Sequence, residues 1–186
     1  MTTLKQLIRR NISEHKKALS GQIITELSKK ICDRVVQTEA FQKASCVALY
    51  YAMDDEVCTS GIIDEWHKKK TIALPVTSGE NINFYEYTKN KDLTKGAFGI
   101  PEPVSGKIIP CESIDLFIVP GIAFDSSCSR LGRGKGYYDR YLSDVKKPII
   151  GICFDFQLID SVPTEKHDMK MTMVITENVI VSSHHQ

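Results

Sequence analysis

The stretch from Arg130 to Leu142 holds the densest set of residues that could do chemistry. In it, Gly132, Gly134 and Gly136 alternate with two cations, and a pattern typical of a helix follows at once. Glycines at alternate positions let the backbone adopt positive φ angles and approach a ligand closely. The N–H groups of such a loop, together with the start of the next helix, form an anion site. We therefore predict that this loop binds a phosphate-bearing ligand.

Charged side chains in and beside the loop fit the same interpretation. Arg130, Arg133 and Lys135 would offset the charge of phosphate, the arginines through bidentate contacts and the lysine as a point charge. Asp139 lies about one helical turn past the last glycine, where a carboxylate can hold Mg²⁺ on bound phosphates. The loop is not a Walker A motif, because glycine follows Lys135, nor a dinucleotide fingerprint, because Tyr137 stands where the third glycine belongs. Composition alone also allows a flexible basic loop.

The elements that must position this loop are those of an α/β protein. Apolar residues at helical spacing predict two helices within residues 3–44, the second beginning near Ser20. Beyond them the pattern predicts strands at 46–51, 71–74, 82–87, 116–119, 149–154 and 173–175, helices at 59–69 and 137–144, and a loop over most of 88–113. This alternation indicates a three-layer α/β/α sandwich with a mostly parallel, mixed central sheet. Ligands of such folds bind beyond the carboxyl ends of the strands.

We expect one domain over residues 1–186, with the N-terminal helices packed on the α/β core. Those helices are rich in basic side chains, and for most of them the plainest interpretation is a solvated helix face. Residues 1–36 carry eight of them: Lys5, Arg9, Arg10, Lys16, Lys17, Lys29, Lys30 and Arg34.

Composition and charge exclude several classes of protein. The chain has 186 residues, 42% hydrophobic and 25% charged, which excludes disorder as its main state. A net charge of +1 gives no support to a general nucleic-acid binder or a membrane-surface protein. No apolar run approaches the roughly 18 residues that span a bilayer, and we expect no signal peptide. None of the six cysteines forms a CxxC pair, so we expect a reduced, cytoplasmic protein without zinc.

Several segments together resemble the 5-formyltetrahydrofolate cyclo-ligase family, also called methenyltetrahydrofolate synthetase. The loop Arg130–Asp139, followed by Tyr141 and Leu142, is similar to the signature of that family. Other similar segments follow the family's order over nearly the whole chain: Lys5 with Arg9, Met53–Glu56, Phe98–Pro103, Pro120–Asp125, and His167 with Asp168.

The resemblance implies an enzyme that uses ATP and Mg²⁺ to convert 5-formyltetrahydrofolate to 5,10-methenyltetrahydrofolate, releasing ADP and phosphate, in one-carbon folate metabolism. The formyl oxygen is phosphorylated, N10 closes the ring, and phosphate leaves. The protein contributes positioning and charge neutralisation. The resemblance also implies a small-molecule substrate, with neither nucleic acid nor a membrane as partner, and we expect a monomer.

The same resemblance assigns roles to single residues. Lys135, Arg133 and Tyr137 are the expected catalytic residues. Asp139 and Asp168 are the expected ligands of Mg²⁺. The expected ATP-binding residues are Lys5, Arg9, Arg130, Leu131, Gly132, Arg133, Gly134, Lys135, Gly136, Tyr137 and Tyr138. The expected folate-binding residues are Tyr51, Glu56, Phe98, Arg133, Gly134, Lys135, Gly136 and Tyr137.

The residues by themselves leave alternatives open. A carboxylate such as Glu56 can accept both the amino group and the ring N–H of a pterin, but it could also belong to an exposed acidic turn. Phe98 could stack on the flat ring or lie in the core. Asp168 could be a surface carboxylate, and Lys5 with Arg9 an exposed basic face. A phosphotransfer enzyme with another substrate, or a binder without activity, also remains open.

Overall fold

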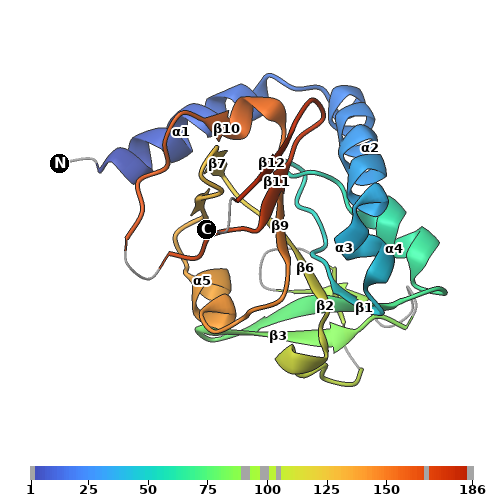
Figure 1. Ribbon diagram of the computed structural model, residues 1–186. Helices are drawn as coiled ribbons and strands as arrows, with labels where there is room; N and C mark the ends of the chain where they lie inside the picture. Colours follow the sequence, from blue (N-terminus) through green and yellow to red (C-terminus); the bar gives the residue numbers. More distant parts are fainter. Residues whose placement is uncertain (1–2, 89–92, 97–100, 104–105, 166–167, 184–186) are drawn as a thin grey trace.

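The computed structural model describes residues 3–88, 93–96, 101–103, 106–165 and 168–183 (Figure 1). Within them, the main sheet has seven strands in the order β12-β11-β9-β6-β1-β2-β3. The inner strands pair in parallel, and the two edge strands pair antiparallel. The strands are β1 (Cys46–Ala48), β2 (Thr71–Ser78), β3 (Asn81–Glu86), β6 (Leu116–Pro120), β9 (Ile149–Ile152), β11 (Met173–Ile175) and β12 (Ile180–Ser182).

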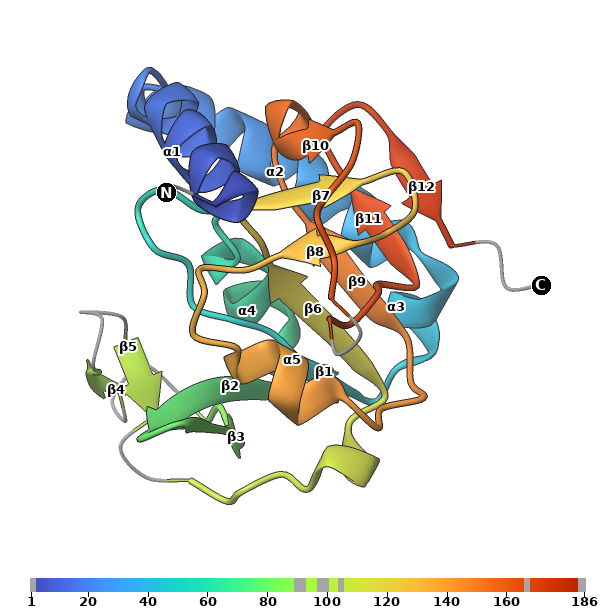
Figure 2. The same ribbon diagram turned by 90° about the vertical axis from the view of Figure 1, so that its left-hand side faces the viewer.

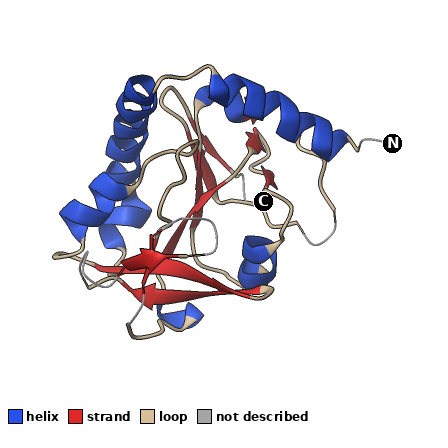
Figure 3. Cartoon of the chain, turned by 180° about the vertical axis from the view of Figure 1, so that it is seen from behind, coloured by secondary structure: helices blue, strands red, loops and turns tan. Residues whose placement is uncertain are grey.

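Helices surround this sheet, which confirms the predicted α/β class with a mostly parallel, mixed sheet (Figure 3). None of the helices that the structure describes has the length and apolar character needed to cross a bilayer. The helices are α1 (Leu4–Lys17), α2 (Gly21–Gln37), α3 (Glu39–Lys43), α4 (Ser60–Trp66) and α5 (Tyr137–Leu142), with short 3₁₀ turns η2 (Cys111–Ser113) and η3 (Asp155–Gln157).

The two faces of the sheet carry separate apolar clusters because side chains alternate along a strand. Val47, Ile118 and Ile150 pack in one cluster with residues of α2, α3 and α4. Ala48 and Phe117 belong to the opposite face, which α5 and strand β7 cover. Figure 1 shows α2, α3 and α4 on one side of the sheet and α5 on the other. Apolar side chains therefore cover both faces of the parallel strands, as the predicted layers require.

A small second sheet, in the order β10-β7-β8, forms part of the outer layer on the α5 side (Figure 2). Its strands are β7 (Ala123–Asp125), β8 (Arg130–Leu131) and β10 (Leu158–Ile159). Phe124 of β7 packs so closely on β9 that a Cβ on Gly151 would lie 2.3 Å from its ring. Helix α1 packs on the small sheet through Ile8 and Ile12. This sheet fixes the point from which the glycine-rich loop departs.

Local signals explain where the N-terminal helices begin. The Thr3 hydroxyl accepts a hydrogen bond from the Gln6 N–H, and the Gln6 side chain accepts from the Thr3 N–H, which is a capping box. The Ser20 side chain accepts from the Ile23 N–H and so caps α2, which begins where the sequence predicted.

Some predicted boundaries were wrong. Strand β2 continues through Pro75 to Ser78 instead of ending before the proline. Proline is tolerated there because β1 pairs only with residues 71–73 and because the carbonyl of the opposite Phe84 accepts from the Ile109 N–H. The segment 88–113, predicted to be mostly loop, contains η2 and a hairpin of β4 (Leu93–Lys95) and β5 (Pro101–Pro103).

Candidate active site

The predicted site residues gather where chain segments leave the carboxyl ends of β1 and β6. Residues 49–59 follow β1 and carry Tyr51 and Glu56. Pro120 ends β6, and β7 and β8 then lead into the glycine-rich loop and α5. Helix α1 lies beside the small sheet, so it brings its own basic residues to the same region (Figure 2). The predicted site residues thus lie at the edge of the sheet where parallel α/β folds bind their ligands.

Two adjoining cavities share the wall that this loop makes. The first, of about 230 Å³, is bordered mainly by aromatic and aliphatic side chains. The second, of about 820 Å³, is more polar and lies toward α1. Both touch Arg130, Gly132, Gly136 and Asp139. A ligand in one cavity would therefore meet a ligand in the other across the glycine-rich loop.

The cavities divide the predicted residues between them. Those that line only the first are Tyr51, Glu56, Arg133, Lys135, Tyr137 and Tyr138. Those that line only the second are Lys5, Arg9, Leu131, Gly134 and Asp168. Phe98 and His167 lie outside the described residues.

The backbone of the loop explains two of its three glycines. Gly134 has φ +100° and Gly136 has φ +68°, in the left-handed region that side chains disfavour. Gly136 is the N-cap of α5, and a Cβ there would lie 2.6 Å from Nη1 of Arg140. Gly132 needs no positive φ, but a Cβ on it would lie 2.9 Å from the guanidinium of Arg130. Glycine at 132 therefore leaves room for a buried arginine.

Arg130 and Asp139 form an ion pair beneath the loop. Nη2 of Arg130 donates to both carboxylate oxygens of Asp139, at 3.1 and 3.2 Å. Nη1 of Arg130 donates to the Pro120 carbonyl at 3.1 Å, and the guanidinium lies over the ring of Tyr138. The side chain of Arg130 is only 4% exposed. These contacts connect β8 and α5 to the end of β6. The two residues therefore hold the loop in place in addition to lining both cavities.

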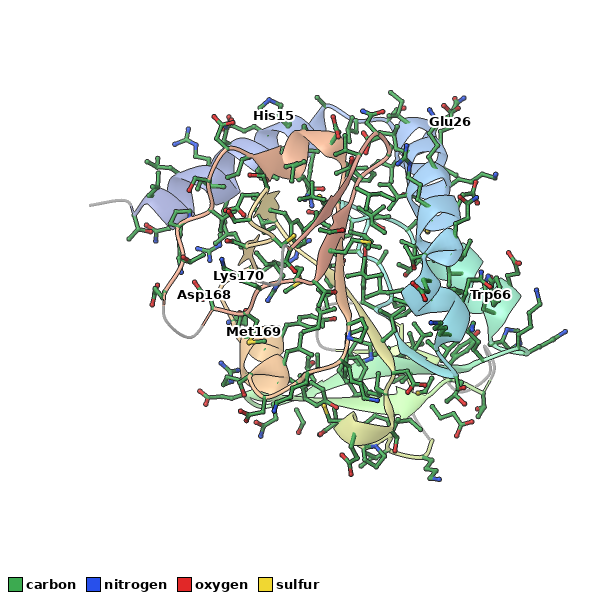
Figure 4. The ribbon with its side chains drawn as sticks, in the orientation of Figure 1. His15, Glu26, Trp66, Asp168, Met169 and Lys170 are labelled. Atoms are coloured by element: carbon green, nitrogen blue, oxygen red, sulfur yellow. The ribbon has the colours of Figure 1, made fainter. Side chains whose placement is uncertain are left out.

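Helix α1 brings two cations to the second cavity. Nζ of Lys5 lies 2.9 Å from carboxylate oxygens of both Glu165 and Asp168. Figure 4 shows Asp168 on the segment between α1 and α5. Burial lowers the pKa of Lys5, but these two hydrogen bonds outweigh it, so the pKa lies above its ordinary value. Nε of Arg9 donates to the Gly132 carbonyl at 3.0 Å.

Arg133 turns from the loop toward the segment after β1. Its Nε and Nη2 lie 3.2 and 3.0 Å from Oε1 of Glu56, and Nη2 lies 2.6 Å from Oδ1 of Asp55. Burial lowers the pKa of Arg133, but the two carboxylates outweigh it and hold the pKa above its ordinary value. Oε2 of Glu56 accepts from the Met53 N–H at 3.1 Å. Ion pairs of Arg133 therefore join the glycine-rich loop to the segment that follows β1.

Two tyrosines at the start of α5 border the first cavity. The Tyr137 hydroxyl donates to the Gly79 carbonyl at 3.0 Å, which joins α5 to the β2–β3 turn. Burial, with a further contribution from Glu56, raises the pKa of Tyr138 well above its ordinary value. Tyr138 therefore stays neutral at physiological pH.

Comparisons with known proteins identify the family of this chain. The model of the 5-formyltetrahydrofolate cyclo-ligase family matches residues 1–177. The chain belongs to the 5-formyltetrahydrofolate cyclo-ligase family. A probable 5-formyltetrahydrofolate cyclo-ligase from Schizosaccharomyces pombe is 32% identical, over 97% of this chain and 98% of that protein.

Two solved structures of 5,10-methenyltetrahydrofolate synthetases are also similar to this chain. The solution structure of 5,10-methenyltetrahydrofolate synthetase from Aquifex aeolicus is 34% identical and covers 99% of this chain and 95% of its own, with a TM-score of 0.90. The corresponding synthetase from Mycoplasma pneumoniae is 26% identical and covers 94% of this chain and 99% of its own, with a TM-score of 0.77. The fold and the family thus agree over nearly the whole chain.

Within this family member, the described residues contain no group of three or more His, Cys, Asp or Glu that could hold a metal ion alone. Asp139 and Asp168 both border the second cavity, and each faces a cation, Arg130 and Lys5 respectively. Mg²⁺ is commonly held by one or two carboxylates together with substrate phosphates. The two aspartates fit that mode, in which Mg²⁺ would compete with the two cations.

Sequence reasoning missed two residues at this site. Lys16 was counted among basic residues most of which were expected on a solvated face, yet its side chain is only 4% exposed. Asp55 was not singled out from the sequence, yet it contacts Lys16 at 3.3 Å as well as Arg133. The spacing of Lys16 with Ile8 and Ile12, four residues apart each time, could have indicated that it lies on the buried face of the cyclo-ligase's first helix.

Proposed function

We propose that this chain converts 5-formyltetrahydrofolate to 5,10-methenyltetrahydrofolate and consumes ATP in an Mg²⁺-dependent reaction. The observation that carries the proposal is the pair of cavities joined by the glycine-rich loop. The aromatic cavity suits the flat pterin ring, and the polar cavity with its cations suits polyphosphate. Membership of the cyclo-ligase family supports the same substrate pair.

In the proposed reaction, the formyl oxygen of the folate attacks the γ-phosphorus of ATP, and ADP leaves. N10 of the folate then attacks the activated formyl carbon and loses its proton to solvent, and the bond from that carbon to the phosphorylated oxygen breaks. Inorganic phosphate leaves, and the ring is closed. The chemistry requires the two substrates to be aligned and the phosphate charge to be offset, which is what rigid loops and fixed cations supply.

The proposed roles follow the two cavities. Glu56 would accept the amino group and ring N–H of the pterin, and Tyr51 would border the ring. Lys135 would lie between the pterin and the polar cavity and offset charge on the transferred phosphoryl group. Lys5 and Arg9 would contact the phosphates from the side of α1.

The rest of the loop would complete the site. Arg133 would act beside Lys135, and Tyr137 would border the reacting groups. Asp139 and Asp168 would hold Mg²⁺, whose positive charge would offset that of the phosphates. Phe98 stays a predicted folate contact.

The test is a turnover assay that follows the near-ultraviolet absorbance of the methenyl product. Purified protein is mixed with 5-formyltetrahydrofolate, ATP and MgCl₂, and each component is omitted in turn. Lys135→Ala should lower kcat by about 10²-fold or more, because a cation aimed at developing charge is lost. Lys146→Ala, which removes an exposed lysine outside both cavities, is the matched control.

Absorbance that grows only with ATP, Mg²⁺ and Lys135 would support the proposal. A flat trace from folded wild-type protein would refute it and direct the search to another phosphoryl acceptor for the same loop. An unchanged rate in Lys135→Ala would leave the reaction in place and refute the assignment of this lysine.

A further inference from the structure

Four side chains of alternating charge connect α1 to the glycine-rich loop. Lys16 contacts Asp55, Asp55 contacts Arg133, and Arg133 contacts Glu56, at 3.3, 2.6 and 3.0 Å. The four come from three segments: the last turn of α1, the segment after β1, and the loop. We call Lys16, Asp55, Arg133 and Glu56 the charge chain. It balances two cations against two carboxylates.

Arg133 occupies the atoms of Glu56 that a pterin would need. Its Nε and Nη2 present two N–H groups side by side to Oε1. The amino group and ring N–H of a pterin present the same donor pair. The other oxygen of Glu56 already accepts from Met53 N–H. A pterin that binds Glu56 must therefore displace Arg133.

The structure already holds a second partner for the displaced guanidinium. Asp55 contacts Arg133 through Oδ1 and Lys16 through Oδ2, so each of its oxygens has its own cation. Asp55 also stands next to Glu56 in the chain, and two neighbouring carboxylates repel each other. The buried ammonium of Lys16 offsets that repulsion and fixes the orientation of Asp55.

We propose that Lys16 and Asp55 are positioning residues that retain Arg133 when the folate takes its place on Glu56. The inference rests on the proposed function, because it takes Glu56 as the carboxylate that binds the pterin. Asp55 lowers the free-energy cost of replacing Arg133 by the pterin, because Arg133 loses its contact with Glu56 but keeps its contact with Asp55. The same contact keeps Arg133 beside the reacting groups instead of releasing it to solvent.

The burial of the charge chain supports this role. The side chain of Lys16 is 4% exposed, while those of Arg133 and Asp55 are 41% and 39% exposed. Lys16 is thus the cation fixed in the interior, and the half-exposed Arg133 is the cation that we expect to move. Burial lowers the pKa of Lys16, with Asp55 acting in the opposite direction, and Lys16 and Arg133 hold the pKa of Asp55 below its ordinary value against the effect of burial.

The test compares the affinity of two ligands by isothermal titration calorimetry. The variant Lys16→Met/Asp55→Asn removes one charge of each sign, so the net charge of the site is unchanged. We expect its Kd for 5-formyltetrahydrofolate to rise about three- to fivefold, in line with a half-exposed ion pair. Its Kd for ATP should stay equal to that of the wild type, because neither residue lines the polar cavity. A merely structural role would weaken both ligands together.

Arg10→Met/Glu14→Gln is the matched control, because it removes an exposed ion pair of the same helix without changing net charge. It should bind both ligands as the wild type does. If Lys16→Met/Asp55→Asn does not fold, Lys16→Met alone carries the same expectation, because it leaves no buried cation unpaired and Asp55 keeps Arg133. Asp55→Glu should recover part of the folate affinity.

Two results would overturn the inference. One is an unchanged or lower Kd for folate in the variant, and the other is an equal loss of ATP and folate affinity. Failure of the proposed function would look different, because the wild-type protein itself would then bind no 5-formyltetrahydrofolate.

Discussion

Asp139→Ala should destabilise the fold as well as slow the reaction, because it leaves the buried guanidinium of Arg130 without its carboxylate. Removing one partner of a buried ion pair costs about 3–5 kcal/mol. The side chain of Arg130 is 4% exposed and that of Asp139 is 18% exposed. Since Asp139 is in partial contact with solvent, we expect the lower end, about 3 kcal/mol. For a chain of this length that corresponds to a fall in Tm of roughly 6–12 °C.

The assay is thermal and urea unfolding followed by circular dichroism. Arg130→Met/Asp139→Ala removes both charges, so its loss of unfolding free energy should be smaller than the sum of the two single losses. Asp144→Ala, which removes an exposed aspartate just beyond α5, should melt like the wild type. A Tm of Asp139→Ala within about 1 °C of the wild-type value would refute the argument. A loss in the double variant equal to the sum of the losses in Arg130→Met and Asp139→Ala would also refute it.

Three further predictions concern the frame of the site and its response to pH. Gly151→Ala should lower the free energy of unfolding by about 3 kcal/mol, because the added methyl group collides with the ring of Phe124. Urea unfolding measures this loss, and the double variant Gly151→Ala/Phe124→Leu should regain part of it. Gly136→Ala should cost about 1–2 kcal/mol for its left-handed backbone, again by urea unfolding, whereas a wild-type midpoint would contradict the strain argument. Hydrogen bonds from the Cys46 and Ser45 N–H groups hold the pKa of Asp115 below its ordinary value against partial burial. Its contribution to stability is therefore present above about pH 4, the unfolded-state pKa, and is lost as the pH falls through the folded-state pKa. Asp115→Asn should flatten that acid limb of the unfolding curve, and an unchanged slope would count against the assignment.

The inner strands of the central sheet were predictable because they are apolar on both faces, whereas the edge strand β12, with three largely exposed residues, was not predicted. Continuous apolar runs such as those at 116–119 and 149–154 indicate buried parallel strands even when the neighbouring strands are not known. The small sheet was not predictable in this way. Its strands β8 and β10 have two residues each, too few to show a period, and β10 pairs with β7 more than thirty residues earlier in the chain. Such pairing is decided by tertiary packing.

In the candidate site, too, local features were predictable from the sequence and long-range contacts were not. The glycine-rich loop was predicted to bind a ligand because alternating glycines and cations are local features, and that role stays a prediction. The partners of its cations could not be predicted. Arg133 meets Glu56 across 77 residues of sequence, and Lys5 meets Asp168 across 163. Arg130 was expected to offset phosphate, a role that stays a prediction, while the structure buries it against Asp139.

The pairing of cations with carboxylates in the polar cavity has a consequence for how anions arrive. Lys5 and Arg130 are already neutralised by carboxylates of the chain itself, which act as built-in counterions. A polyphosphate that binds here as proposed would exchange places with these carboxylates instead of releasing loosely held ions from solution. Screening by added salt acts mainly on exposed, unpaired charge. The affinity of this cavity for polyphosphate should therefore depend only weakly on ionic strength, and simple anions of the surrounding medium should compete poorly for it.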